Sequence, residues 1–416
     1  MGRIEIVGGK PLTGEIKVSG AKNEALKVIP LSLLIKNKFK ISNVPDIADI
    51  RKQLEILEDL GGKYTFENNT LEIDGSTARG NTLKNGLATK LRASIVYLGP
   101  LLARFKEVTI PFPGGCAIGQ RPIDSHIKAF EDLGATVVCE KESYRISFEE
   151  FVSSSVTLSE QSVTATENVL LFLSYFDEEF EMSNCAIEPE IMALCEVLNK
   201  AGAKVEISGD RKFKITGSSD LNLTEIEIIP DRIEAFSYLI AFLITSGSGS
   251  IVNFPAQFMK SPLQKLKEIG ANFEFDGDKI IIHATESFLP FEIETAPYPG
   301  FPTDMQSPMS LMATRAQGVS KIKELMFENR LAYIEQLKKM GLDGQVDGSE
   351  AEITGPTSLN GTHIEALDLR SGITLVLAAL AAQGKSVIEK GEIIGRGYEN
   401  LEEKLSTLGA DIKSYD

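Results

Sequence analysis

Two kinds of apolar pattern recur along the chain. In the first, apolar side chains return at every third or fourth position, as in residues 127–133, 263–269 and 401–408. This spacing predicts amphipathic helices with one buried face. In the second, the segment is apolar on nearly all sides, which predicts a helix buried all round. Segments of this second kind are residues 25–35, 92–105, 168–176, 232–244, 307–314 and 373–382.

A glycine follows each amphipathic pattern, in short runs such as EDLGA, NKAGA and KEIGA. The spacing of these glycines is about 70 residues, which indicates an internal repeat. Each is expected to take the left-handed position that ends a helix, and alternating strand-like runs such as AKVEIS come next. The glycines are Gly61, Gly134, Gly202, Gly270, Gly341 and Gly409.

The repeating unit therefore reads as buried helix, strand, loop, amphipathic helix and strand. Six units predict an α/β protein of two domains, each with three units, buried helices inside and sheets outside. The boundary is expected near residue 229. Residues 1–21 have no repeat of their own, so this pattern lets them complete either domain.

The buried helices begin with polar residues, in the runs SGAKNEA, TKLRAS, SVTATEN, PDRIEA, FPTDMQS and LDLRSG. One interpretation is that Ser, Thr and Asp merely cap helices and Arg neutralises nearby carboxylates. However, helix starts also attract anions, and four carry a cation: Lys22, Arg92, Arg232 and Arg370. Converging starts would favour a ligand that bears phosphate.

Charge and composition narrow the classes of function. The formal net charge of −16 over 416 residues disfavours general attraction to nucleic acid or anionic membrane. No apolar run reaches the length of a membrane span and MGRIEIVGGK has no signal-peptide core, so a cytoplasmic protein is expected. The four cysteines and three histidines show no metal-site or disulfide spacing. We expect no metal and no cofactor.

The segment PFPGGCAIGQRP (111–122) places Cys116 after two glycines and shortly before Arg121. A thiol in a glycine-rich loop near a cation is expected to have a lowered pKa and to be reactive. The alternative is a small apolar residue in an ordinary connection. The cationic, glycine-rich context favours the reactive interpretation.

These motifs together resemble a known family. PGGCAIGQRPIDSHIKAFEDLGA, SGAKNEALKV, FPTDMQ, MFENR and DLRSGITLVLA are similar to segments of the UDP-N-acetylglucosamine 1-carboxyvinyltransferases, across essentially the whole chain. The resemblance implies two inside-out α/β barrel-like domains: residues 22–229 with the cysteine loop, and residues 1–21 with 230–416. It also implies transfer of the enolpyruvyl group of phosphoenolpyruvate to the 3′-hydroxyl of UDP-N-acetylglucosamine, the step that opens peptidoglycan synthesis.

The resemblance further implies roles for single residues. Cys116 is the expected acid and the site of a covalent adduct, and Asp304 the candidate base or orienting group for the sugar hydroxyl. Contacts to phosphoenolpyruvate are expected from Lys22, Arg121 and Arg396. Those to the sugar nucleotide are expected from Asn23, Arg92, Arg121, Pro122, Ile123, Asp124, Ser125, Ser162, Val163, Thr164 and Met326. Arg330, Glu328 and Arg370 are expected to organise the site by pairing, with direct substrate contact a second role for the two arginines.

Some positions depart from the family pattern. Ser125 stands where an apolar residue is common, Glu160 near a frequent lysine, and Thr164 at a frequent glycine. These departures concern the nucleotide pocket rather than the cysteine loop. Two alternatives stay open: 3-phosphoshikimate 1-carboxyvinyltransferase, which shares the repeats and the donor, and a catalytically silent sugar-nucleotide sensor. The oligomeric state is not predicted.

The glycines of the cysteine loop suggest that it closes over bound substrate. We therefore expect UDP-N-acetylglucosamine to protect residues 111–122 from limited proteolysis, measured by mass spectrometry of the fragments. Cleavage at the same rate with and without the sugar nucleotide would contradict this.

Overall fold

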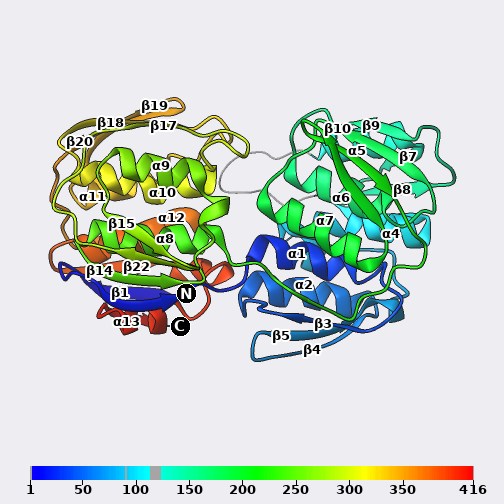
Figure 1. Cartoon of the computed structure of the whole chain (residues 1–416), viewed down its shortest axis with the longest axis horizontal. Coiled ribbons are helices and arrows are strands. Elements are labelled where there is room, and N and C mark those ends of the chain that lie inside the picture. The colour runs from blue at the N-terminus through cyan, green and yellow to red at the C-terminus, as the bar shows by residue number, and fades with distance from the viewer. Residues whose placement is uncertain (1, 90, 113–122, 416) are drawn as a thin grey trace. The chain divides into compact units, whose positions relative to one another are not determined.

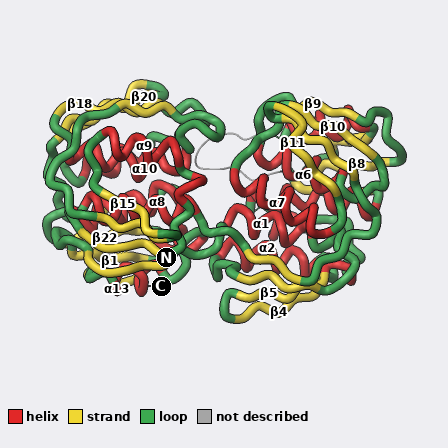
Figure 2. Tube along the Cα trace, in the orientation of Figure 1, coloured by secondary structure: helices red, strands yellow, loops and turns green. Residues whose placement is uncertain are grey.

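The computed structural model describes residues 2–89, 91–112 and 123–415, which form two compact units. The N-terminal unit contains the described residues from 20 to 229. The C-terminal unit contains residues 2–19 and 230–415. Within each unit, strands lie toward the outside around a group of helices, as Figures 1 and 2 show, although helix α13 (Leu401–Thr407) is drawn beyond strand β1 (Arg3–Val7). The inside-out α/β architecture predicted from the repeats is thus confirmed for each unit.

The segments predicted as helices buried all round form the interior of each unit, and in α8 all thirteen residues are buried. In the N-terminal unit these helices are α1 (Lys22–Leu31), the 3-10 helix η2 (Arg92–Tyr97) leading into α4 (Leu98–Phe105), and α6 (Val163–Leu173). In the C-terminal unit they are α8 (Arg232–Ile244), α10 (Thr303–Ser310) leading into η4 (Leu311–Arg315), and α12 (Leu369–Ala381).

Residues 92–105 depart from the single helix that their pattern predicts. Asn168 of α6 donates to the carbonyl of Ile95 and accepts from the amide of Gly99, at 3.0 and 2.8 Å. In an α-helix those two backbone groups would bond to each other. The inserted side chain, together with Pro100, explains why the segment starts as a 3-10 helix. A Cβ on Gly99 would lie 2.2 Å from the Asn168 carbonyl oxygen, so this approach requires glycine.

The amphipathic helices cover the interior and end as predicted. They are α2 (Ala48–Asp59), α5 (Asp124–Leu133), α7 (Pro189–Ala201), α9 (Lys260–Glu268), α11 (Tyr333–Lys339) and α13 (Leu401–Thr407). The repeat glycine after each has a positive φ, between 89° and 114°. Glycine adopts this left-handed conformation without the steric cost of a Cβ, which explains its recurrence.

The described strands of the N-terminal unit form three sheets. Their orders are β13-β3-β5-β4, β11-β12-β10-β9 and β6-β8-β7. The strands are β3 (Phe39–Ser42), β4 (Lys63–Glu67), β5 (Thr70–Asp74), β6 (Glu107–Pro111), β7 (Ala135–Cys139), β8 (Ser143–Phe148), β9 (Ser155–Thr157), β10 (Glu179–Ser183), β11 (Lys204–Gly209), β12 (Lys212–Thr216) and β13 (Glu225–Glu227).

The described strands of the C-terminal unit also form three sheets, in the orders β21-β22-β1-β23, β15-β16-β14-β2 and β17-β18-β20-β19. The strands are β1 (Arg3–Val7), β2 (Thr13–Lys17), β14 (Ser248–Val252), β15 (Phe273–Asp276), β16 (Lys279–Ile282), β17 (Glu292–Glu294), β18 (Gly318–Lys323), β19 (Asp343–Asp347), β20 (Glu350–Gly355), β21 (His363–Glu365), β22 (Lys385–Glu389) and β23 (Asp411–Tyr415).

Two strands pair away from the helix that follows them in the chain. Strand β2 precedes α1 but pairs in parallel with β14 of the C-terminal unit, and β13 precedes α8 but pairs in parallel with β3 of the N-terminal unit. Strand β1 lies between β22 and β23. The N-terminal segment therefore completes two sheets of the C-terminal unit. Among the described residues, no helix has the length and apolar character to cross a membrane.

Two repeat glycines of the N-terminal unit allow a matched test of the caps. Gly134→Ala and Gly202→Ala both place a side chain at a φ above 110°, which costs about 1–2 kcal/mol. At Gly134 the new Cβ would also lie 2.5 Å from the Glu150 carbonyl oxygen, whereas at Gly202 its nearest neighbour is 3.8 Å away. In urea unfolding, Gly134→Ala should lower the free energy of unfolding by about 1–3 kcal/mol more than Gly202→Ala does. Equal losses would contradict the backbone clash.

Candidate active site

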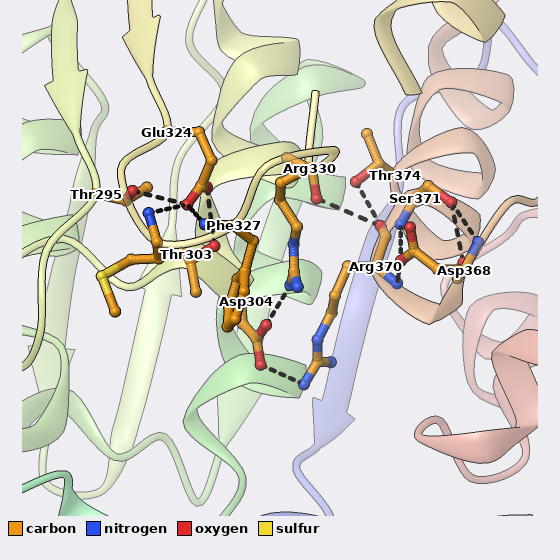
Figure 3. A network of polar contacts seen from close by, with 12 residues as sticks. Thr295, Thr303, Asp304, Glu324, Phe327, Arg330, Asp368, Arg370, Ser371 and Thr374 are labelled. Atoms are coloured by element: carbon orange, nitrogen blue, oxygen red, sulfur yellow. Dashed lines mark hydrogen bonds and ion pairs between the residues drawn. The ribbon is translucent and has the colours of Figure 1, made fainter. Parts of the chain in front are cut away.

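In the C-terminal unit, Asp304 joins two buried guanidinium groups (Figure 3). Asp304 is the second residue of α10. One of its carboxylate oxygens accepts from Arg330, and the other accepts from Nη2 of Arg370 at 2.8 Å. Arg330 and Arg370 are only 6% and 9% exposed. The pairing predicted for these two arginines is therefore present, while Glu328 is exposed.

The two arginines control the ionisation of Asp304. Burial alone would raise the pKa of the carboxyl group, but Arg370 and then Arg330 outweigh burial and hold the pKa well below its usual range. The low pKa of Asp304 therefore comes from the two neighbouring guanidinium groups. Asp304 therefore stays ionised, and its carboxylate is a strong hydrogen-bond acceptor but a weak base.

Arg370 is oriented by the capping of its own helix. Asp368 accepts from the amides of Arg370 and Ser371 at 2.7 and 3.1 Å, and the Ser371 hydroxyl accepts from the Asp368 amide at 2.9 Å. Thr374 donates to the Arg370 carbonyl at 2.9 Å. This reciprocal capping box fixes the first turn of α12. The start of α12 therefore fits the first interpretation of the polar helix starts, in which Asp caps the helix and Arg neutralises a nearby carboxylate.

Sequence reasoning missed a buried carboxylate, that of Glu324. It is 3% exposed and follows β18. It accepts from the hydroxyls of Thr295 and Thr303 and from the amide of Met326, at 3.0, 2.8 and 2.8 Å. The segment KELMFENR carried no signal for this role because the two hydroxyl donors, Thr295 and Thr303, lie 29 and 21 residues away in the chain. Met326 itself is half-buried, as is Arg396 at the end of η5 (Gly391–Arg396).

In the N-terminal unit, Lys22 and Asn23 begin α1. Lys22 is 8% exposed, and its Nζ lies 2.7 Å from Oδ2 of Asp49, a buried residue of α2. Asp49 was not predicted. A buried ammonium is costly unless it is paired, so Asp49 makes it possible for α1 to carry this cation at its start.

A second set of polar residues in the N-terminal unit lies around α6, a helix that packs against η2 and α5. Ser162 caps α6 by accepting from the Ala165 amide at 3.4 Å, and Arg92 begins η2. Burial, followed by repulsion from Arg92, lowers the pKa of His126 to about 3, so its imidazole is neutral. His126 is a further residue that sequence reasoning missed.

The remaining predicted residues take different environments. Ile123 and Ser125 are buried, at 2% and 4% exposure, whereas Asp124 at the start of α5 is exposed. Val163 and Thr164, in the first turn of α6, are half-buried. The predicted roles of Cys116, Arg121 and Pro122 lie outside the described residues.

Another buried carboxyl group lies beside Lys22 in the sequence. Glu24 is 1% exposed and accepts from the Ile229 amide at 2.8 Å. Burial, reinforced by repulsion from Glu190 and Glu196, raises its pKa to about 8. Glu24 is therefore a group of the N-terminal unit that ionises near neutral pH.

Comparison with known proteins gives consistent results. A sequence model of the family described as EPSP synthase (3-phosphoshikimate 1-carboxyvinyltransferase) matches residues 6–405. The UDP-N-acetylglucosamine 1-carboxyvinyltransferase of Campylobacter lari is 42% identical over 412 residues, covering 99% of this chain and 98% of the relative. The protein of the same name from Desulfosudis oleivorans is 40% identical over 413 residues, covering 99% of both.

Two solved structures share the fold. The enolpyruvyl transferase NikO from Streptomyces tendae has a TM-score of 0.91 at 22% identity, covering 99% of this chain and 98% of that one. An EPSP synthase from Acinetobacter baumannii has a TM-score of 0.78 at 17% identity, with both chains fully covered.

The raised pKa of Glu24 predicts a pH dependence of stability. An acid whose pKa is raised in the folded state binds its proton more tightly there than in the unfolded state. The free energy of unfolding therefore falls as the pH rises from 4.5, the ordinary pKa of a glutamate, to about 8, the pKa of Glu24 in the folded protein. Glu24→Gln should reduce this fall, measured by urea unfolding between pH 5 and pH 8. Glu227→Gln, at an exposed position, is the control and should retain the wild-type slope. An unchanged slope in Glu24→Gln would contradict the assignment.

Proposed function

The chain belongs to the EPSP synthase family of enolpyruvyl transferases, and within it to the UDP-N-acetylglucosamine 1-carboxyvinyltransferases. We propose that it transfers the enolpyruvyl group of phosphoenolpyruvate to the 3′-hydroxyl of UDP-N-acetylglucosamine and releases phosphate. The observation that carries this conclusion is the near full-length identity of about 40% with proteins of that name. The half-buried, arginine-paired Asp304 gives the reaction a physical basis.

The chemistry requires addition followed by elimination. The sugar hydroxyl attacks C2 of phosphoenolpyruvate and loses its proton, while the C2–C3 double bond becomes single and C3 gains a proton. C3 then loses a proton and the bond from C2 to the phosphate oxygen breaks, which restores the double bond. Such a site needs an acid near C3, a group that orients the attacking hydroxyl, and cations around a carboxylate and a phosphate.

The C-terminal unit supplies the orienting group. Asp304 is kept ionised by Arg330 and Arg370, so it accepts a hydrogen bond from the 3′-hydroxyl and aims its oxygen. Its low pKa favours orientation over early proton removal; proton transfer to Asp304 becomes easier as negative charge leaves the hydroxyl in the transition state. Arg396 contacts phosphoenolpyruvate, with bidentate geometry suited to its carboxylate or phosphate. Met326 lies beside the sugar.

The N-terminal unit supplies the anion contacts. Lys22, held by Asp49, binds phosphoenolpyruvate, and Asn23 contacts the sugar nucleotide. The first amides of α6, at residues 162–164, face the diphosphate at the positive end of the helix dipole. Arg92 adds a full positive charge there, whereas the neutral imidazole of His126 adds none. Residues 122–125 face the uracil ring.

Cys116 is the acid and the site of covalent attachment in this proposal, together with Arg121 as a phosphoenolpyruvate contact. Both assignments come from the cysteine-loop motif in the sequence. A thiol whose pKa lies near neutrality can serve as proton donor or as nucleophile, because both forms are populated. The same thiol makes alkylation by fosfomycin an expected property.

The biological setting follows from the reaction. The product would enter peptidoglycan synthesis in the cytoplasm and thereby support cell-wall formation, cell shape and division. A single measurement distinguishes the proposal from its two alternatives, which are transfer to shikimate 3-phosphate and ligand binding without turnover.

That measurement is phosphate release from phosphoenolpyruvate with either acceptor. We expect release with UDP-N-acetylglucosamine, none with shikimate 3-phosphate, and inactivation by fosfomycin. Cys116→Ala should lower the rate by about 100-fold or more. Cys139→Ala, which replaces an exposed cysteine, is the matched control and should retain activity.

Release with shikimate 3-phosphate would favour the first alternative, and binding of the sugar nucleotide without release would favour the second. An unaffected Cys116→Ala variant would remove the acid assignment.

A further inference from the structure

Glu324 lies where three parts of the C-terminal unit meet (Figure 3). It comes directly after β18 and accepts from Thr295, the residue after β17, and from Thr303, the first residue of α10. Its remaining donors are the amides of Met326 and Phe327, at 2.8 and 3.2 Å. One buried carboxylate thus joins a sheet, a buried helix and the segment that leads to Arg330.

A carboxylate suits this position because four donors converge on it. Its two oxygens offer about four acceptor sites, and the four described donors are all neutral hydroxyls or amides. Burying a charge has a stability cost even when it is well hydrogen-bonded. Stability alone therefore explains Glu324 less well than a requirement for fixed geometry.

The contacts of Glu324 reach both members of an ion pair at the candidate active site. Thr303 precedes Asp304 in α10, and the capping residue Pro302 forms no side-chain cap, so the Thr303 bond to Glu324 fixes the helix start. On the other side, the Arg330 guanidinium lies over the Phe327 ring, 5.4 Å from its centroid. Glu324 fixes the Phe327 amide. Asp304 and Arg330 therefore approach each other from two segments held by one carboxylate.

We propose that Glu324 is a positioning residue for enolpyruvyl transfer, acting through Thr303 and Phe327 to set Asp304 against Arg330. The role rests on the proposed function, in which Asp304 orients the sugar hydroxyl. Glu324 does not touch the reacting atoms. It determines where the Asp304 carboxylate lies, because a displaced orienting group loses much of its effect.

The test uses near-isosteric variants of the full chain. Thr303→Val removes the hydroxyl that bonds Glu324 to α10, and Glu324→Gln replaces the carboxylate by an amide. Thr245→Val is the matched control: the Thr245 hydroxyl is also buried and bonded, to the Ala241 carbonyl at 2.8 Å, but at the end of α8. Each variant is also made in an Asp304→Asn background.

We expect Thr303→Val and Glu324→Gln to lower kcat about tenfold and to raise KM for UDP-N-acetylglucosamine more than KM for phosphoenolpyruvate. In the Asp304→Asn background either change should lower kcat by less than about twofold, because a residue that acts through Asp304 has no further effect once Asp304 is replaced. Thr245→Val should lower the melting temperature by about as much as Thr303→Val does, but it should leave kcat unchanged.

A second readout does not depend on turnover. The titration of the Asp304 carboxyl, followed by carbon NMR of selectively labelled protein, should move to higher pH in Thr303→Val and Glu324→Gln, because the arginine pairs loosen. It should not move in Thr245→Val. Full multiplicative losses of kcat in the Asp304→Asn background, or an unmoved Asp304 titration, would overturn the role of Glu324. Absence of phosphate release by the wild-type protein would instead count against the proposed function.

Discussion

A charge removed from water must be paired or satisfied by hydrogen bonds, and this constraint determines how the candidate active site is built. Asp304 is ionised because Arg330 and Arg370 flank it, and those arginines can be buried because Asp304 bridges them. Lys22 stands in the same relation to Asp49. In both units, charges that could bind a substrate already occupy fixed positions in the folded protein.

Pairing in advance has a consequence for catalysis. Groups that are already oriented need little reorganisation when charge develops on a bound substrate. The stability cost lies in withdrawing further polar groups from water. Examples are the half-buried Asp368–Ser371 capping box and the four hydrogen bonds to the buried Glu324. These networks hold the starts of the buried helices, where the candidate site residues Asp304 and Arg370 lie.

The repeat also explains how the chain closes its two units. Glu24 and Glu234 occupy equivalent positions in α1 and α8, and each accepts a backbone amide where the chain passes from one unit to the other: Ile229 at 2.8 Å and Ser19 at 2.6 Å. Next to these residues, β2 and β13 complete sheets of the unit opposite to their following helix. The same contact occurs twice because each connection between the units leaves a backbone amide, that of Ser19 or Ile229, near the start of a buried helix, where a glutamate accepts from it.

The sequence by itself determined the features that depend on neighbours in the chain. Apolar periodicity identified the buried and amphipathic helices, the repeat glycines marked the left-handed caps, and the polar runs located Lys22, Asp304 and Arg370 at helix starts. Only the tertiary structure decided the partners. Folding brings distant partners to four residues that no local spacing predicts: Asp49, His126, Asn168 and Glu324. Asn168 shows the reason most directly: it interrupts a helix 69 residues away, by a bond that exists only once two segments pack.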